Sequence, residues 1–486
     1  MNLKQKALQG VVWSAIQNWG SQSCSFIVFL ILARLLSPEA FGLVALANVF
    51  LAFMQIFMEQ GFTQALIQRQ DLESEHLNTA FWSQVGCGIL LAVISALGAG
   101  VVAQFFNQPK LIPILQCLSL LFIVNSFGHV HKALLSREFA FKIMALRSLL
   151  GIVVSGIVGV AMAYAGHGVW SLVAQQLVYE SVGVLVMWQA VDWRPALQFS
   201  PKHFQHLFDF GIHVLVFKFI KFFNKRSDNL LIGYFLGEVA LGYYAIAYRI
   251  LQVMIQLIIT TFNQVALPTF SRLQNEPDRF RQAFYQATQL TSLIAFPAFL
   301  GVVVLTPELV ISLFGEQWQP AIRAMQILAF EGIVQSVSFF HKSVFMSMGK
   351  PFWKVKLTLF NATINIIACL IVVKWGITAV ALAYVVSNYL AFPLSQWAVN
   401  KLIKIPLLPY TQQFITPVVS SVLMVIAILI AKYFLVNLVT TQVLLIITIV
   451  WGTIIYILSI KFLNPQLFQQ IVELVRMAIF SKKRAT

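Results

Sequence analysis

Charged residues are scarce in this sequence. Asp, Glu, Lys and Arg make up 10% of the 486 residues, whereas hydrophobic residues make up 59%. A soluble domain has about 25% charged residues and about 45–50% apolar residues. The composition therefore excludes a soluble globular protein. It predicts an all-α polytopic membrane protein, with room for about fourteen transmembrane helices of roughly 20–25 residues each.

Cysteine is also rare, and patterns typical of catalysis are missing. Cys24, Cys87, Cys117 and Cys369 lie in apolar stretches, without a CxxC pair or the spacing of a metal site. We therefore expect no metal and no cofactor. The predicted outer loops do not exceed about a dozen residues, and no predicted loop carries a DxD motif. A membrane glycosyltransferase or glycan polymerase usually needs such a loop, so we expect a protein that is not an enzyme.

Acidic residues are outnumbered almost two to one. The chain has 33 Lys and Arg against 17 Asp and Glu, a net charge of +16. The basic residues are spread over short loops, which argues against a nucleic-acid partner. We assign 23 of the 33 to one side of the membrane and 5 to the other side. The positive-inside rule then predicts that both termini are cytoplasmic. The apolar run that follows Lys4 and Lys6 is too long for a signal peptide and predicts the first span.

The sequence matches itself at a shift of 200–210 residues. Matching pairs include Gly42 and Gly242, Gln64 and Gln264, His131 and His341, and Gly166 and Gly376. Each copy contains six predicted spans, and an even number places both copies in the membrane in the same orientation. We therefore expect two six-helix lobes, related as parallel repeats, around a central cleft, plus two C-terminal helices.

The domain boundaries follow from this repeat. The N-terminal six-helix lobe takes residues 1–195 and the C-terminal six-helix lobe takes residues 196–405. Helices 13 and 14 occupy residues 406–463. Residues 464–486 form a cytoplasmic amphipathic tail, which we expect to contact membrane lipids.

One predicted span is unusual in its basic residues. Lys218, Lys221, Lys225 and Asp228 lie within about 80° of one another on a helix, in an apolar run from about residue 206 to residue 236. A basic side chain in hydrocarbon costs about 2.5–3.5 kcal/mol. Lys218 and Lys221 are too far from the ends of the run to reach water by snorkelling. The face therefore predicts a polar cleft that binds an anion; the alternative is a set of ion pairs that serve folding alone.

Other polar residues are assigned to the same cleft. At a shift of 200 residues, the three lysines correspond to Asn18, Ser21 and Ser25 of the first span, which offer hydrogen bonds to sugar hydroxyls. The predicted substrate-binding residues are Lys218, Lys221, Lys225, Arg226, Arg249, Asn18, Ser21 and Ser25.

Four stretches of the chain are similar to a known family. They are GVVWSAIQNWGSQSCSFIVFLILARLLSPEAFGLVALANVF from residue 10, EQGFTQALIQR from residue 59, ALPTFSRLQNEPDRFRQAF from residue 266 and FGEQWQPAIRAMQILA from residue 314. They resemble the polysaccharide (Wzx-type) flippases, in particular the colanic-acid-type exporters, within the superfamily that also holds multidrug (MATE) exporters and lipid II flippases.

The resemblance implies a two-lobed transporter of the bacterial cytoplasmic (inner) membrane. Such a protein moves an undecaprenyl-pyrophosphate-linked oligosaccharide repeat unit to the periplasmic leaflet by alternating access, for exopolysaccharide or lipopolysaccharide export. It also implies polysaccharide polymerase machinery as a possible partner. A lipid II flippase and a MATE-like exporter of another amphiphile remain the alternatives, with a glycan polymerase or glycosyltransferase more remote.

Acidic residues within the predicted spans are candidates for ion coupling. They are Glu59, Asp228, Glu331 and Glu180. Each of them could bind H+ or Na+ during transport, or could balance the charge of a neighbouring cation.

Overall fold

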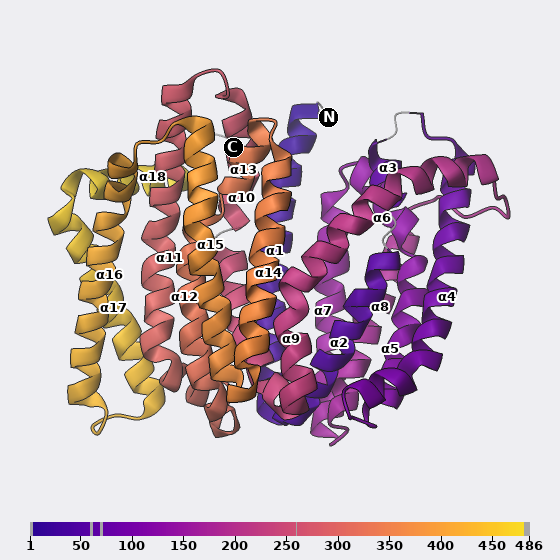
Figure 1. Cartoon of the computed structure of the whole chain (residues 1–486), viewed down its shortest axis with the longest axis horizontal. Helices are drawn as coiled ribbons and strands as arrows, with labels where there is room; N and C mark the ends of the chain where they lie inside the picture. The colour runs from indigo at the N-terminus through magenta and orange to yellow at the C-terminus, as the bar shows by residue number, and fades with distance from the viewer. Residues whose placement is uncertain (1–2, 59–61, 69–70, 259, 481–486) are drawn as a thin grey trace. The chain divides into compact units, whose positions relative to one another are not determined.

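The computed structural model describes residues 3–58, 62–68, 71–258 and 260–480. Over these ranges the chain is helical and contains no strand (Figure 1). The first half consists of α1 (Leu3–Leu35), α2 (Pro38–Met58), α3 (Phe62–Gln68), α4 (Ser74–Phe105), α5 (Leu111–Ser126), α6 (His129–Arg137), α7 (Phe141–Tyr164), α8 (Val169–Ala190) and α9 (Pro201–Ile258). The second half consists of α10 (Thr260–Arg272), α11 (Pro277–Leu313), η1 (Glu316–Ala321), α12 (Ile322–Ser338), α13 (His341–Ser347), α14 (Pro351–Val372), η2 (Val373–Trp375), α15 (Ile377–Ile403), α16 (Leu407–Leu435), α17 (Thr441–Leu463) and α18 (Pro465–Phe480).

Many of these helices are long and apolar enough to cross a membrane. Within the described ranges ten helices meet this condition, or eleven if the bent pair α5 and α6 counts as one span. The predicted class, an all-α polytopic membrane protein, is confirmed, whereas the number of fourteen spans stays a prediction. One reason is α9, in which two predicted spans form one element that is broken at Gly237, where φ is +82°.

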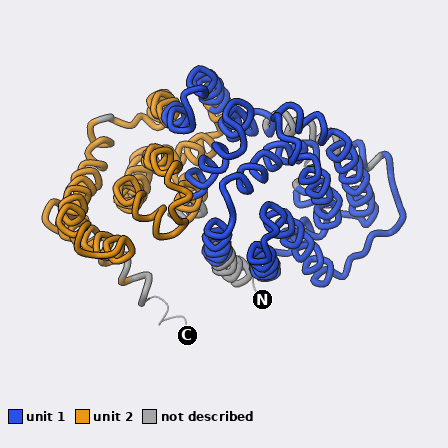
Figure 2. The backbone as a smooth tube through the Cα atoms, turned by 90° about the horizontal axis from the view of Figure 1, so that it is seen from below, with its two compact units in different colours: residues 1–249, 358–384 blue, residues 250–357, 385–486 orange. Residues whose placement is uncertain are grey.

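The chain divides into two compact units (Figure 2). Unit 1 contains Met1–Arg249 and Thr358–Tyr384, and unit 2 contains Ile250–Leu357 and Val385–Thr486. The units are defined by contacts, whereas the lobes proposed above are defined by sequence repetition. The lobe boundaries after residues 195 and 405 therefore stay predictions.

Residues that match in the sequence occupy corresponding places in the two halves. Gly166 before α8 has φ +80° and Gly376 before α15 has φ +97°, so both turns need a residue without a side chain. His131 stacks on Trp188 of α8, with 4.6 Å between ring centroids. His341 stacks on Phe392 of α15 at 6.0 Å. The short helices correspond as well, because α3 packs on α6 and α10 packs on α13.

Two matching glycines also lie in direct contact within unit 1. A Cβ atom on Gly42 would lie 1.7 Å from the carbonyl oxygen of Glu238, and one on Gly242 would lie 2.0 Å from that of Pro38. Pro38 and Glu238 are themselves 200 residues apart, so the two contacts are equivalent under the repeat. The start of α2 and the part of α9 after Gly237 thus cross at backbone contact.

An ion pair lies close to this crossing. Lys110, before α5, donates to a carboxylate oxygen of Glu39 in α2 at 2.6 Å. Both residues lie at the end of unit 1 that we assign to the outer side. The hydrogen bond to Glu39 and the charge of that carboxylate raise the pKa of Lys110. The lysine therefore stays charged at any physiological pH.

Candidate substrate-binding and ion-coupling sites

The basic stretch of α9 is held in place by its phenylalanines. Phe219 and Phe222 pack against Phe53 of α2, with ring centroids 5.7 Å and 5.6 Å apart. At 100° per residue, the face that carries Lys218, Lys221 and Lys225 is turned about 100° from the phenylalanine face. Packing of α9 on α2 therefore turns the lysines away from this contact.

The exposure of the cations agrees with that orientation. Lys221 and Lys225 are exposed in unit 1, whereas Lys218 and Arg226 are half-buried. The next turn of the helix, Ser227 to Asn229, is fully buried. In unit 1 these cations thus lie at or near the surface over about two turns of α9, before the buried turn from Ser227 to Asn229.

Arg249, in the part of α9 after Gly237, contacts α1. Its guanidinium donates a hydrogen bond to Ser25 Oγ at 3.1 Å and lies 5.7 Å from the centre of the Phe29 ring. One turn earlier, the buried Oγ of Ser21 has no hydrogen-bond partner in the described structure. The side chain of Asn18 lies outside the described residues. The structure therefore brings together Ser25 and Arg249, two of the residues that the sequence assigns to one cleft.

Asp228 lies in a buried polar cluster of unit 1. It is 1% exposed, and its carboxylate accepts hydrogen bonds from the Tyr244 hydroxyl and the Asn229 N–H, both at 2.8 Å. The Tyr244 ring stacks on Tyr248, whose hydroxyl lies 3.4 Å from that of Tyr384 in α15. Each carboxylate oxygen thus accepts a hydrogen bond from a neutral donor, which stabilises the buried group.

Glu180 has a basic partner. Arg147 of α7 donates to its carboxylate at 3.2 Å, and both side chains are largely shielded from solvent. This contact favours charge balance over ion coupling for Glu180. Glu59 lies outside the described residues.

Glu331 differs from the other acidic residues. It lies on α12 in unit 2 and is 2% exposed. Gln335 donates a hydrogen bond to one carboxylate oxygen at 3.0 Å, and the other oxygen is buried without a partner in the described structure. A buried carboxylate without a counter-charge is stabilised by taking up a proton or a cation. Of the described acidic candidates, Glu331 therefore has the best environment for ion coupling.

Several partners in these sites were not singled out from the sequence. Arg147 lies six residues into α7 and Glu180 ten residues before the end of α8. Two antiparallel neighbouring helices place such positions at a similar depth in the membrane. The spacing in the sequence was therefore enough to suggest this pair. Tyr244 and Tyr248 are four residues apart and share a helix face, but nothing in the sequence connects them to Tyr384, 136 residues further on.

Within the described ranges there is no cluster of three or more His, Cys, Asp or Glu side chains that could hold a metal ion.

The fold is that of a polytopic helical membrane protein. Solved structures with a similar fold include the lipid II flippase MurJ in an inward closed conformation, with a TM-score of 0.76 and 15% identity over 94% of this chain and 99% of that chain. A multidrug resistance MATE family transporter of the MOP superfamily, in an inward-facing conformation, has a TM-score of 0.62 and 16% identity over 79% of this chain and 96% of that one.

Sequence comparison then gives the family. Residues 31–323 match the family of polysaccharide biosynthesis proteins, and the chain belongs to that family. Teichuronic acid biosynthesis protein TuaB of Bacillus subtilis is 25% identical over 86% of this chain and 87% of its own length. Lipopolysaccharide biosynthesis protein WzxC of Escherichia coli is 26% identical over 76% of each chain.

A third relative is named for transport. Succinoglycan biosynthesis transport protein ExoT of Rhizobium meliloti is 28% identical over 68% of this chain and 67% of its own length. The predicted resemblance, and the expectation of a membrane transporter of polysaccharide biosynthesis rather than an enzyme, are confirmed by the family and these relatives.

Proposed function

We propose that this protein is a flippase that carries a polyprenyl-pyrophosphate-linked oligosaccharide across the bacterial cytoplasmic (inner) membrane. The observation that carries the proposal is the basic face of α9, where Lys218, Lys221 and Lys225 lie together on one side of the helix, at the start of the candidate span Lys218–Ile258. Membership of the polysaccharide biosynthesis family supplies the class of substrate. Both termini are cytoplasmic in this proposal, as the distribution of basic residues predicts.

The chemistry of binding is electrostatic. A pyrophosphate diester carries about two negative charges, and charge-assisted hydrogen bonds from lysine are roughly twice as strong as neutral ones. In a site partly shielded from water the attraction increases further, because the effective dielectric constant is lower. Arg226 adds positive charge next to the lysines, and Arg249 adds it from the part of α9 after Gly237. Asn18, Ser21 and Ser25 of α1 offer neutral donors and acceptors suited to sugar hydroxyls.

Alternating access moves the bound group across the membrane. The pyrophosphate and the sugars stay with polar side chains of the protein, while the polyprenyl chain stays in the lipid. The protein thus supplies a polar route for the part of the substrate that hydrocarbon would reject. A polysaccharide polymerase is the expected recipient of the product on the periplasmic side.

Ion coupling is assigned to Glu331. Its buried carboxylate has one oxygen without a partner, whereas both oxygens of Asp228 accept hydrogen bonds and Glu180 is paired with Arg147. A single carboxylate with one amide neighbour suits a proton better than Na+, which needs several oxygen ligands. Protonation removes the charge that would otherwise be buried during a conformational change.

The test uses a deletion strain fed with a radiolabelled sugar precursor. Complete lipid-linked oligosaccharide should accumulate on the cytoplasmic side without the gene and return to normal with it. The double variant Lys218→Ala with Lys221→Ala should insert normally but fail to restore export.

A matched control replaces two lysines on exposed surfaces. These are Lys356, which lies over the Phe352 ring, and Lys401, which lies over the Trp397 ring. The variant Lys356→Ala with Lys401→Ala should export normally. Full export by the Lys218 and Lys221 variant, or an unchanged lipid-linked pool in the deletion strain, would overturn the proposal.

A further inference from the structure

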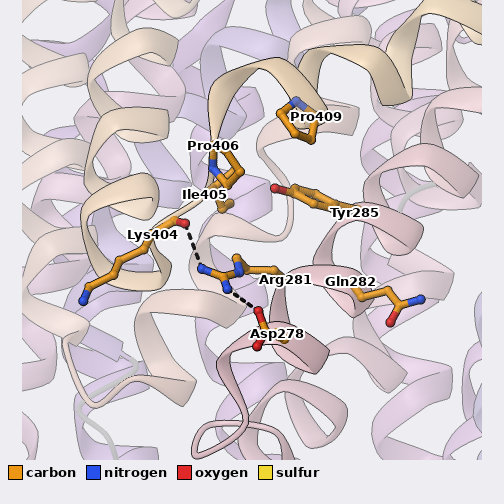
Figure 3. A pocket seen from close by; sticks show the side chains of 8 residues that line it. All are labelled: Asp278, Arg281, Gln282, Tyr285, Lys404, Ile405, Pro406 and Pro409. Atoms are coloured by element: carbon orange, nitrogen blue, oxygen red, sulfur yellow. Dashed lines mark hydrogen bonds and ion pairs between the residues drawn. The ribbon is translucent and has the colours of Figure 1, made fainter.

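A cavity of about 680 Å³ lies at one end of unit 2 (Figure 3). One wall is a face of the first turns of α11, and the other is the linker between α15 and α16 with the first residues of α16. The lining residues are Asp278, Arg281, Gln282, Tyr285, Lys404, Ile405, Pro406 and Pro409. The cavity is separate from the α9 site, which belongs to unit 1.

Arg281 is one of two cationic residues that line this cavity, with Lys404. Its guanidinium donates to the backbone carbonyl of Lys404 at 3.1 Å and forms an ion pair with Asp278 (Figure 3). The arginine side chain is 27% exposed, whereas that of Asp278 is 92% exposed. An ion pair with so exposed a carboxylate contributes little stability, because water competes for both groups. The guanidinium is therefore held in position by the linker and can exchange Asp278 for another anion.

Tyr285 in the cavity wall and Tyr410, which packs on it, have unused hydrogen-bonding groups. Tyr285 lies across the cavity from Arg281, with its hydroxyl directed toward Ile405 and Pro406 (Figure 3). Its ring packs 6.1 Å from that of Tyr410, which is 3% exposed. Both hydroxyl oxygens are buried and have no hydrogen-bond partner within the described residues. Buried polar groups are normally paired, so an acceptor for these donors is expected.

The internal repeat supplies a comparison within the same chain. Helices α4 and α11 directly follow Glu73 and Glu276, which are 203 residues apart. At that shift Arg281 corresponds to Asn78, Gln282 to Thr79 and Tyr285 to Trp82.

In unit 1 the side chains at these positions form hydrogen bonds with the equivalent linker, which connects α8 and α9. Asn78 accepts a hydrogen bond from Ala196 N at 3.0 Å and donates one to Gln198. Thr79 accepts a hydrogen bond from Ser200 N, and Trp82 donates one to Ala196 O at 2.8 Å. The side chains of unit 1 thus use their polar groups on their own linker. In unit 2 Arg281 likewise donates to its own linker, at Lys404 O, but the Tyr285 hydroxyl has no hydrogen-bond partner within the described residues. Both side chains line the cavity.

We propose that this cavity binds the phosphate of an anionic membrane lipid. Arg281 and the Tyr285 hydroxyl bind the phosphate oxygens, and Ile405, Pro406 and Pro409 contact the glycerol and the first carbons of the acyl chains. A guanidinium suits a phosphate because its donors match the oxygen geometry.

The position in the chain favours a lipid over a soluble phosphate. Leu408, in the same part of α16, is 70% exposed, as a residue that faces lipid would be. The cavity lies where α11 leaves the connection from α10, which the basic residues place on the cytoplasmic side. Basic pockets between helices on that side bind anionic headgroups, and the cytoplasmic leaflet attracts cations through its negative surface potential.

The test is lipid binding by the purified full chain. Native mass spectrometry from micelles that contain phosphatidylglycerol or phosphatidylcholine measures the lipid retained on the protein. We expect the natural sequence to retain phosphatidylglycerol preferentially. Arg281→Gln should weaken this retention about tenfold, the effect of losing one charge-assisted interaction. Tyr285→Phe, which removes a single oxygen atom, should weaken it less without affecting folding.

The control is Arg279→Gln, which removes an exposed arginine two residues away that pairs with Glu276. It should leave retention unchanged. The double variant Arg281→Asn with Tyr285→Trp copies the pattern of unit 1 and should abolish the preference.

Three results would overturn the proposal. They are equal retention of the two lipids, an equal effect of the Arg279 and Arg281 variants, and displacement of the lipid by millimolar inorganic phosphate. The last result would indicate a soluble phosphate ligand. None of these outcomes depends on transport, so they are independent of the proposed flippase function.

Discussion

At the scale of single residues, the sequence indicates which charges lie in apolar runs, but it does not give most of their partners. Lys218 and Lys221 are recognisable because a cation in the middle of an apolar run is costly wherever the helix packs. The contact of Arg249 with Ser25 joins residues 224 positions apart. It depends on how α9 packs beside α1, and no local pattern encodes that packing.

Arg147 and Glu180 provide a test of charge balance. Glu180→Gln should lower the free energy of unfolding by about 1–3 kcal/mol, because it leaves a largely shielded guanidinium without its partner. Arg147→Gln together with Glu180→Gln should recover most of that loss, since neither charge remains. The thermal unfolding midpoint of the protein in nanodiscs measures both effects. If the double variant is as unstable as the single one, the pair does not act as charge balance.

Glu331 provides the residue-scale test of coupling. Glu331→Gln keeps an acceptor for Gln335 but cannot take up a proton, so we expect normal insertion with transport that no longer responds to a pH gradient. Flipping into membrane vesicles, measured with and without an imposed gradient, checks this. Glu276→Gln, at an exposed carboxylate on the connection before α11, is the control and should retain the response. An unchanged response in the Glu331 variant would exclude this residue as the coupling site.

At the scale of elements, the repeat in the sequence predicted correspondence but not contact. Matching glycines such as Gly42 and Gly242 indicate equivalent places in two copies. The structure shows in addition that α2 and the second part of α9 cross at these two glycines. Contact between equivalent positions requires a local two-fold relation of the two copies, which residue spacing alone does not specify.

This crossing has little space for a side chain. Gly42→Ala should destabilise the protein by about 1–3 kcal/mol, because the new Cβ would overlap the carbonyl oxygen of Glu238 and force the backbones apart. Gly98→Ala in α4 is the matched control, since no atom lies within 4 Å of its added Cβ. That variant should be neutral or stabilising by up to about 1 kcal/mol. Equal unfolding midpoints for the two variants would contradict a close crossing in the native protein.

At the scale of the whole molecule, the hydrophobic composition was enough for the class of fold but not for a count of spans. Helices in lipid must be long and apolar, so their presence can be read from the sequence. Their number depends on breaks such as Gly237, where a single element of 58 residues contains two predicted spans. The cavity between α11 and the linker was not predictable either, because its two walls are separated by about 120 residues of sequence.

Orientation in the membrane remains a prediction from basic residues, and it can be tested with single cysteines. The natural cysteines would first be replaced by alanine. Asp71→Cys, between α3 and α4, should then react with a membrane-impermeant maleimide only after the cells are permeabilised. Asn437→Cys lies in the turn between α16 and α17. This turn is at the far end of α17 from the basic tail, so the cysteine should react in intact cells. Both positions are exposed, so a missing reaction reports sidedness rather than burial. The reverse pattern would place both termini outside. The anionic group of the substrate would then have to reach the basic face of α9 from the outer leaflet.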